Sequence, residues 1–540
     1  MSDAAGGKVM AGNGVTTTIY PQLGRAAHLA EQGKHEQAAQ LIMAHLREHP
    51  DEPRGLAQLG QTAMRLGALG QAEHFLRRAL ARGERSLETR RALAGVLNQQ
   101  ERLQDALALF ELLERESDDD VLPAVRGQIL ARLGRHEEAL AAQEAVARKH
   151  PDNPGHWVSW GHSLRADGRV EEAIAAYRYA AEADFECGEA WWGLAAIKRQ
   201  VLTDEDVARM REAIGIAIDE RNSAPLQFAL ARALHDRGEY REAFEHYSEG
   251  NRQRAESLGY KASELTAEVA EVERSVDPAF VRSLDAAPIG DLTPVFIVSL
   301  PRSGSTLLEQ MLGSHPSIEP VGELPYAPAI LRSAMEMATR RQHVTVPQLI
   351  AGLSREQAAP MGQDYLRRAA WHRQTDRPFF IDKLPHNWSN VLFIRKILPQ
   401  ARFIDIRRDP MDCCFSNFTQ SFSSAHASSF ALRDIGQVYV DYVRLMAHHD
   451  RVAPGLVDHV RNEELVEQPE PEVRRLLESL GLPWDPAVLE FHRLERVVRT
   501  PSSEQVRRPL NREGMGIWKP YAEWLGPLRE TLGELADGSG

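Results

Sequence analysis

Residues 295–316 have the sequence VFIVSLPRSGSTLLEQMLGSHP, and this stretch decides the fold of the second half of the chain. VFIVSL is a short apolar run rich in β-branched residues, which is typical of a buried parallel strand. PRSGST (301–306) follows as a loop, and the apolar spacing of LLEQMLGSHP predicts a helix. This order creates an anion-binding geometry, because free backbone N–H groups and the helix dipole both face a negative ligand.

Side chains of the loop suit the same ligand. Arg302 offers a planar fork of donors to sulfate or phosphate oxygens. Gly304 permits close approach of the backbone, and Ser305 and Thr306 offer hydroxyl donors. A Walker A loop would instead need a lysine directly before its Ser or Thr. Here the cationic residue precedes the glycine, which disfavours a nucleoside triphosphatase.

Polar side chains also follow three further predicted strands. Glu323 lies in IEPVGELPY, Lys383 in RPFFIDKLPHNW, and Arg408 in ARFIDIRRDPMDCCFSNF, with Ser416 eight residues later. Ligands of an open parallel sheet bind outside the carboxyl ends of its strands. We therefore expect these groups to converge on one crevice with the PRSGST loop.

The first half of the chain is repetitive. Alanines recur at intervals of 34, 34, 33 and 34 residues, each preceded five positions earlier by Gly or, once, by Glu101. Each unit is predicted to be two amphipathic helices joined at the Gly turn, with a bulky residue beside the small Ala. The alanines are Ala38, Ala72, Ala106, Ala139 and Ala173; after a lapse between residues 200 and 222, Gly238 and Ala243 mark one more copy.

The repeats resemble the tetratricopeptide repeat, most clearly in HWVSWGHSLRADGRVEEAIAAYRYA (156–180). Such repeats stack into a superhelix with an extended concave surface. The resemblance implies a protein or peptide partner on that surface, or a contact through which the chain forms oligomers.

The second half resembles bacterial sulfotransferase domains that are fused to tetratricopeptide repeats and, more distantly, animal protein-tyrosine sulfotransferases. The matching stretches occur in the family order: PRSGSTLLEQMLGSHP, VGEL, DKLPHNW, RRDPMDCCFS, WDPAVLEFHRLERVVRTPSSEQVRRPL and GIWKPY. The resemblance implies a P-loop-like α/β sheet and the co-substrate 3′-phosphoadenosine-5′-phosphosulfate. It places the 5′-phosphosulfate on Arg302, Ser303, Gly304, Ser305 and Thr306, and the 3′-phosphate on Arg408 and Ser416.

Sulfuryl transfer needs a base for the acceptor proton and a cation for the leaving oxygen, as phosphoryl transfer does. Glu323 is the candidate base by resemblance, and Lys383, with Arg302, is the candidate cation. His386 is a rival base, because other sulfotransferases use a histidine. The animal enzymes have two acidic residues in a row, whereas Leu324 follows Glu323 here, and this weakens the case for a tyrosine acceptor.

The tail is expected to close over the nucleotide, with Ser503 at a family binding position. Asn462 stands where the family often has Tyr, and Ile517 where a basic residue is common, which puts the contacts of this region in doubt. Arg512 is a candidate substitute for the missing cation. The chemistry requires no metal.

Bulk composition excludes several classes of protein. A formal net charge of −13 argues against a general nucleic-acid binder. Three cysteines are too few for a disulfide framework and suit a reducing compartment. The first residues lack a secretory h-region, and no apolar run approaches the roughly 18 residues of a membrane span. We therefore expect a cytoplasmic protein that does not bind membranes.

We predict a disordered N-terminus (1–19), a tetratricopeptide-repeat array (20–255), a helical linker (256–290) and a sulfotransferase domain (291–540). The expected activity is sulfuryl transfer to an acceptor hydroxyl. The leading candidate for the acceptor is the tyrosine of a protein or peptide held by the repeats. Two alternatives remain open: a small-molecule O-sulfotransferase, and a scaffold whose sulfotransferase half is degenerate.

Overall fold

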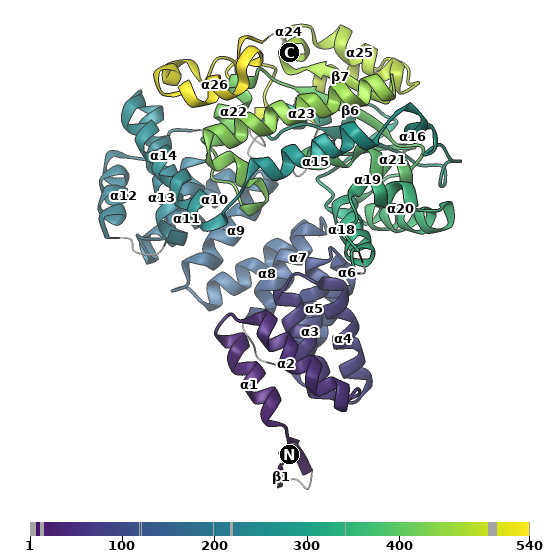
Figure 1. Ribbon diagram of the computed structural model, residues 1–540. Helices are drawn as coiled ribbons and strands as arrows, with labels where there is room; N and C mark the ends of the chain where they lie inside the picture. Colours follow the sequence, from purple (N-terminus) through teal and green to yellow (C-terminus); the bar gives the residue numbers. More distant parts are fainter. Residues whose placement is uncertain are drawn as a thin grey trace. The chain divides into compact units, whose positions relative to one another are not determined.

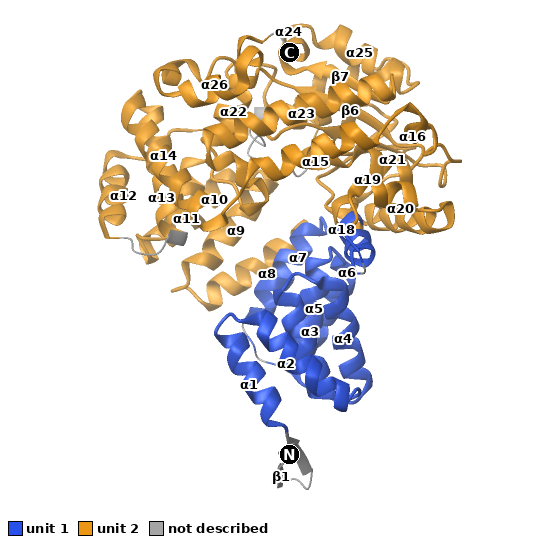
Figure 2. Cartoon of the chain, viewed as in Figure 1, with its two compact units in different colours: residues 1–135, 331–343 blue, residues 136–330, 344–540 orange. Residues whose placement is uncertain are grey.

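The computed structural model describes residues 7–10, 16–117, 119, 121–197, 199–216, 220–340, 342–494 and 505–538. The chain divides into two compact units, Met1–Arg135 with Leu331–His343, and His136–Ile330 with Val344–Gly540 (Figure 2). Among the described residues, no helix combines the length and the apolar character needed to cross a membrane.

The first unit contains the early repeats. Two strands, β1 (Gly7–Met10) and β2 (Thr16–Ile19), pair antiparallel within the stretch for which we expected disorder. Helix pairs then follow, as the repeat period predicts (Figure 1). The helices are α1 (Pro21–Glu31), α2 (His35–Glu48), α3 (Pro53–Arg65), α4 (Leu69–Ala81), α5 (Leu87–Gln99), α6 (Leu103–Glu116) and α7 (Val121–Arg132).

The turns between paired helices explain the repeated glycine. Gly33 and Gly67 have φ values of 75° and 77°, in the left-handed region that favours glycine. Glu101, which replaces glycine in the third copy, keeps this conformation with φ of 60°. Its carboxylate pairs with Arg132 of α7. The turn geometry is therefore retained where the glycine is lost.

A segment from the second half of the sequence belongs to the first unit. It includes the end of α18 (Tyr326–Ala338), where Glu336 accepts hydrogen bonds from the backbone N–H groups of Gly70 (2.8 Å) and Gln71 (3.1 Å). The carboxylate thus lies at the N-terminus of α4, where it complements the helix dipole.

The second unit continues the helical array and then builds the sheet domain. Its repeat helices are α8 (His136–Lys149), α9 (Pro154–Asp167), α10 (Val170–Ala183), α11 (Gly188–Ala195), α12 (Asp204–Ile216), α13 (Glu220–Asp236) and α14 (Tyr240–Leu258). The predicted linker region forms α15 (Ala262–Ser275) and α16 (Pro278–Arg282). Thr266 of α15 donates to Asp441 of the sheet domain at 2.5 Å, so α15 packs on that domain.

The sheet has five parallel strands in the order β4-β5-β3-β6-β7, which confirms the predicted α/β class. The strands are β3 (Thr293–Val298), β4 (Ile318–Gly322), β5 (Phe379–Asp382), β6 (Arg402–Arg407) and β7 (Val457–Arg461). The remaining helices are α17 (Ser305–Gly313), α19 (Val346–Gly352), α20 (Arg355–Ala369), α21 (Val391–Ile397), α22 (Pro410–Phe418), α23 (Leu432–Val452), α24 (Asn462–Glu467), α25 (Pro469–Ser479) and α26 (Gly526–Leu532). Short 3-10 helices are η1 (Ala370–His372), η2 (Pro385–Asn390), η3 (Ser424–Phe430), η4 (Pro486–Arg493), η5 (Gln505–Arg507), η6 (Lys519–Trp524) and η7 (Gly533–Asp537).

Both faces of the sheet are buried, as expected for parallel strands. Val295 and Ile297 of β3 face a core that α17, α25 and η4 complete. Phe296, between them in sequence, faces the opposite side and stacks on Phe403 of β6, with ring centroids 5.6 Å apart. This two-sided burial is why VFIVSL is continuously apolar rather than alternating.

The last repeat packs directly on the sheet domain, within the second unit. Asn251 of α14 is buried and donates to the carbonyl of Phe418, the last residue of α22, at 2.9 Å. His235 of α13 lies 2.8 Å from the hydroxyl of Tyr521. The ring of Tyr521 in turn lies 4.6 Å from that of Phe415 on α22. Helix α22 is therefore supported by the repeats as well as by its own domain.

Inside the array, Tyr177 of α10 fits between two glycines. An added Cβ on Gly161 of α9 or Gly193 of α11 would lie 2.6 Å from Cε1 of this fully buried ring. The ring hydroxyl lies 2.7 Å from Nδ1 of His162. Both neighbouring helices therefore approach α10 closely because they carry no side chain at the contact.

We predict that Gly193→Ala lowers the stability of the second unit by about 1–3 kcal/mol, because the methyl group overpacks the site of Tyr177. Scanning calorimetry of the full chain would measure this as a lower unfolding temperature. Gly215→Ala is the matched control: an added Cβ meets no described heavy atom within 4 Å, and alanine favours the helix. Equal unfolding temperatures for Gly193→Ala and the wild type would contradict the packing argument.

Candidate functional site

The loop between β3 and α17 has the backbone of an anion-binding loop. Arg302 and Gly304 both adopt left-handed φ values, 67° and 93°. Helix α17 begins directly after the loop, at Ser305. The backbone N–H groups of its first turn have no acceptor within the helix and can therefore donate to a ligand. A Cβ on Gly304 would collide with the side chain of Asn462, which packs against this position. Glycine is required at this position because the backbone is left-handed and because Asn462 leaves no room for a Cβ.

Two arginines and a serine meet beside this loop. Arg302 Nε donates to Ser416 Oγ of α22 at 3.2 Å. Arg408, which follows β6, donates through Nη1 to the backbone carbonyl of Arg302 at 2.8 Å. Burial, with the like charges of Arg408 and Arg232 of α13, lowers the pKa of Arg302 to about 10. The guanidinium therefore stays charged at neutral pH, in surroundings that an anion would stabilise.

The tail contacts Arg408 and α22. Arg408 donates through Nη2 to the carbonyl of Gly514, and the N–H of Gly516 donates to Asp412 Oδ2 of α22 at 2.7 Å. Arg512 nearby does not turn inward: its exposed side chain lies 3.5 Å from Glu467 Oε1. Ser503 lies outside the described residues.

The other side chains of the loop are buried. Ser303 is 1% exposed, and its hydroxyl lies 3.3 Å from Cys413 Sγ of α22, so it contacts the protein interior rather than the crevice. Ser305 and Thr306 are each 5% exposed in the first turn of α17. For Ser303, the structure thus favours a contribution through the backbone.

Glu323 and Lys383 pair with each other at the ends of β4 and β5. Lys383 Nζ donates to Glu323 Oε1, and Lys383 is 1% exposed whereas the Glu323 side chain is 42% exposed. The loop after β5 also contacts the loop after β3, because the N–H of Ser299 donates to the carbonyl of Pro385 at 3.1 Å. The candidate base and the candidate cation therefore lie at the ends of β4 and β5, next to the loop that carries Arg302.

His386 lies three residues beyond Lys383, at the start of η2. Its ring lies 5.5 Å from that of His426 in η3. Desolvation by surrounding side chains, with the neighbouring His426, lowers the pKa of His386, although the residue is exposed at the surface. The imidazole is therefore neutral at pH 7 and can accept a proton, but it is a weak base.

The sequence analysis missed Asp382, the last residue of β5. This carboxylate is fully buried and accepts from Tyr365 Oη at 2.8 Å. Burial raises the pKa of Asp382 to about 7, although its hydrogen-bond donors act in the opposite direction. A charged residue that ends the apolar strand FFID, directly before the candidate lysine, was the available signal.

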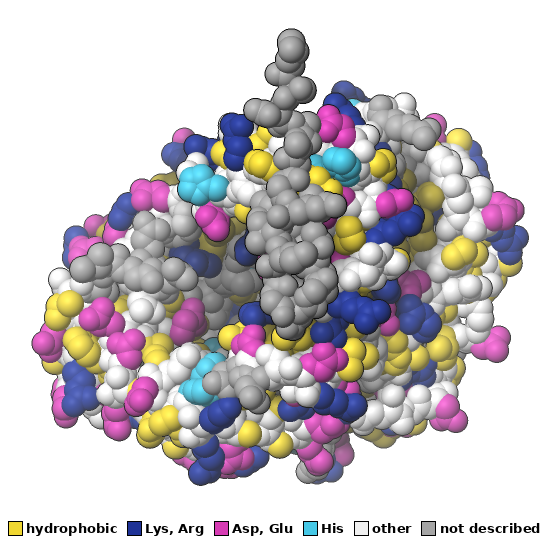
Figure 3. Space-filling view, turned by 90° about the horizontal axis from the view of Figure 1, so that it is seen from below, with side chains coloured by type: hydrophobic (Ala, Val, Ile, Leu, Met, Phe, Trp, Pro, Cys, Tyr) yellow, Lys and Arg dark blue, Asp and Glu magenta, His cyan; other side chains and the backbone are white. Residues whose placement is uncertain are grey.

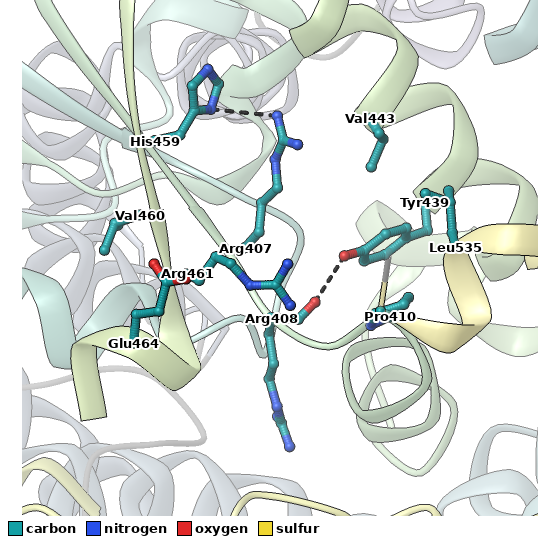
Figure 4. Close-up of a pocket in the computed structure, with 11 residues that line it drawn as sticks. Arg407, Arg408, Pro410, Tyr439, Val443, His459, Val460, Arg461, Glu464 and Leu535 are labelled. Atoms are coloured by element: carbon teal, nitrogen blue, oxygen red, sulfur yellow. Dashed lines mark hydrogen bonds between the residues drawn. The ribbon is translucent and has the colours of Figure 1, made fainter. Parts of the chain in front are cut away.

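A pocket of about 280 Å³ lies at the ends of β6 and β7. In Figure 4 the guanidinium of Arg461 points into it, whereas the side chain of Arg408 extends away from the other lining residues. The carbonyl of Arg408 accepts from Tyr439 Oη at 2.8 Å, and Arg407 pairs with buried Asp405 at 2.7 Å. This pocket is thus adjacent to the arginine–serine cluster but separate from the Arg408 guanidinium.

Charge at the surface is mixed. On the face shown in Figure 3, basic and acidic side chains of the described residues are interspersed. The concentration of positive charge at Arg302 and Arg408 is therefore a local property of the crevice.

Comparisons with known proteins match both halves. Residues 294–486 match the model of the sulfotransferase family, and residues 57–121, 125–154 and 158–199 match the tetratricopeptide repeat. An uncharacterized protein of Aquifex aeolicus (strain VF5) is 28% identical over 79% of this chain and 56% of its own length. Protein-tyrosine sulfotransferase 1 of Danio rerio is 27% identical over 42% of this chain and 66% of its own. YrrB, described as a TPR protein with an unusual peptide-binding site, aligns with 32% of this chain and 88% of its own at 19% identity and a TM-score of 0.29.

The chain thus spans a little over half the length of the first relative and about two thirds of the second. The two resemblances noted in the sequence are confirmed at the level of families. The chain joins tetratricopeptide repeats to a region, residues 294–486, that matches the sulfotransferase family.

Proposed function

We propose that the protein is a sulfotransferase that uses 3′-phosphoadenosine-5′-phosphosulfate and an acceptor hydroxyl. The observation that carries the proposal is the meeting of Arg302, Arg408 and Ser416 beside a left-handed loop at a helix N-terminus. The match of residues 294–486 to the sulfotransferase family supports it.

The residues present fit this co-substrate. Its two phosphate-bearing ends call for several cationic and hydrogen-bond donors, and the cluster of Arg302, Arg408 and Ser416 beside the loop supports this assignment. The loop amides, Arg302 and the start of α17 would hold the 5′-phosphosulfate, and Arg408 with Ser416 would hold the 3′-phosphate. Burial and the like charge of nearby Arg408 lower the pKa of Arg302, and a bound anionic group would offset both effects.

The co-substrate supplies the sulfuryl group and a phosphate leaving group. Glu323 would accept the acceptor proton through its exposed carboxylate, one oxygen of which accepts from Lys383. Lys383 and Arg302 would stabilise negative charge on the leaving oxygen. Glu323 is favoured over His386 because its exposed carboxylate pairs directly with Lys383, the candidate cation.

The acceptor class is a further part of the proposal. The repeats offer a surface for a protein or peptide partner, and similarity to protein-tyrosine sulfotransferase 1 of Danio rerio favours a tyrosine acceptor.

We predict that adenosine 3′,5′-bisphosphate binds the wild type selectively over ADP, which lacks the 3′-phosphate. Arg302→Ala and Arg408→Ala should each lower this affinity by about 100-fold, because a hydrogen bond to a charged group contributes roughly 1.5–3 kcal/mol. Calorimetric titration measures both. Arg433→Ala, which removes an exposed arginine paired with Glu530, is the matched control.

Equal binding of ADP, or unchanged affinity in both variants, would overturn the donor site. In that case the packing of Asn462 on Gly304 and of the Gly514 carbonyl on Arg408 would mark a degenerate site. The scaffold function would then be the better conclusion.

We predict that Glu323→Gln keeps the affinity for adenosine 3′,5′-bisphosphate and lowers turnover about 10²–10⁴-fold, the usual contribution of a general base. The assay follows release of the bisphosphate from the donor with a tyrosine-containing peptide or a simple phenol as acceptor. Glu530→Gln controls for the loss of a carboxylate. Retained turnover in Glu323→Gln, with a larger loss in His386→Asn, would assign the base to His386. The preferred acceptor distinguishes a protein-directed enzyme from a small-molecule enzyme.

A further inference from the structure

Two buried carboxylates lie behind the Glu323–Lys383 pair. Asp382 ends β5 and is fully buried, and Glu309 of α17 is 1% exposed. Burying a carboxylate is costly unless hydrogen bonds compensate, so the bonds that these two accept indicate what they hold.

The two carboxylates hold the backbone on both sides of Glu323. The N–H of Gly322 donates to Glu309 Oε1 at 3.1 Å, and the N–H of Leu324 donates to Asp382 Oδ1 at 3.2 Å. A carboxylate that accepts from backbone N–H groups forms the stronger, charge-assisted kind of hydrogen bond.

Asp382 also holds the backbone after Lys383. Its Oδ1 accepts a second hydrogen bond, from the N–H of Leu384 at 3.1 Å. The N–H of Lys383 donates to the carbonyl of Gly322 at 2.8 Å. One oxygen of Asp382 therefore links the residue after Glu323 to the residue after Lys383.

The link matters because β4 is an edge strand with an irregular end. Among the described strands it pairs only with β5, and the register between the two shifts between Pro320 and Gly322. Gly322 has a φ of 81°, so the chain turns out of the strand just before Glu323. Regular strand pairing cannot orient Glu323 at this point, and the buried carboxylates replace it.

We propose that Asp382 is a positioning residue that sets the geometry of the Glu323–Lys383 pair, with Glu309 fixing the other side of Glu323. Tyr365 orients Asp382 by donating to its second oxygen. The geometric part of this proposal, that Asp382 fixes the positions of Glu323 and Lys383, rests on these contacts alone. The catalytic part, that this positioning supports turnover, rests on the proposed function.

The geometric part is tested by the rate at which an amine-acylating reagent modifies Lys383, measured by mass spectrometry relative to exposed Lys34 in the same intact chain. Lys383 should react slowly in the wild type, because it is buried and paired. Asp382→Ala should raise its rate at least tenfold, to a level near that of Glu323→Gln. Asp382→Asn keeps an oxygen for the Leu324 and Leu384 N–H groups and can donate to Tyr365, so the slow rate should return.

Asp441→Ala is the matched control. It removes another fully buried aspartate, which contacts Thr266 of α15 and Arg444 of α23. The acylation rate of Lys383 should stay as low as in the wild type. If Asp382→Ala fails to fold by circular dichroism, Asp382→Ser, whose hydroxyl is too short to bridge both loops, takes its place. A Lys383 rate in the folded variant equal to that of the wild type would overturn the proposal.

Turnover tests the catalytic part. Asp382→Ala should bind adenosine 3′,5′-bisphosphate within about twofold of the wild type, lose at least tenfold in kcat, and recover in Asp382→Asn. A raised acylation rate of Lys383 in Asp382→Ala, together with an unchanged kcat, would refute a catalytic role for this positioning. A wild type that binds no bisphosphate and releases none from the donor would refute the proposed function, and the labelling result would still decide the geometric part.

Discussion

The parallel pairing of β3 with β5 on one side and with β6 on the other is the constraint on which the crevice depends. Because parallel strands end at the same edge, this pairing places the loops of Arg302, Lys383 and Arg408 side by side. Burial of both faces of β3 between apolar layers keeps the strand from shifting in register, since a one-residue slip would exchange its two faces. The polar chemistry at the edge is thus maintained by apolar packing below it.

The charges of the site differ between its two sides. Burial, with the like charges of Arg408 and Arg232, lowers the pKa of Arg302. On the opposite side of β3, Glu323 and Lys383 neutralise each other. Two arginines therefore meet on one side of β3, and an ion pair lies on the other. This asymmetry suits an anionic donor on the first side and a proton transfer on the second.

Helix α22 connects this chemistry to the repeats. It carries Ser416 toward Arg302, while its last carbonyl accepts from Asn251 of α14. Past its end, Arg254 of α14 lies over the ring of Phe430 in η3, the 3-10 helix that also contains His426. The last repeat therefore forms part of the support of the site, in addition to any surface that it offers to a partner. A partner bound to these helices would act on the same elements that hold Ser416 and His426.

Local pattern was enough to predict the repeat helices and the first strand, loop and helix of the sheet domain, but not β1 and β2 or α12. The strand–loop–helix of residues 295–313, the helix pairs of the repeats and the positions of Glu323, Lys383, Arg408 and Ser416 after their strands all follow from apolar periodicity and motif spacing within short windows. The repeat period also placed a turn at Glu101, where the glycine is absent and the backbone is nevertheless left-handed.

The tertiary structure alone decided which distant groups meet. The pairing of Glu323 with Lys383 joins residues 60 apart, and the contact of Asn251 with Phe418 joins residues 167 apart. The hydrogen bonds of Asp382 to two loops, the outward turn of Arg512 and the packing of Asn462 on Gly304 are of the same kind. Such contacts leave no periodic trace in a single sequence, because they depend on strand order and on the shape of neighbouring loops rather than on the spacing of residues along one element.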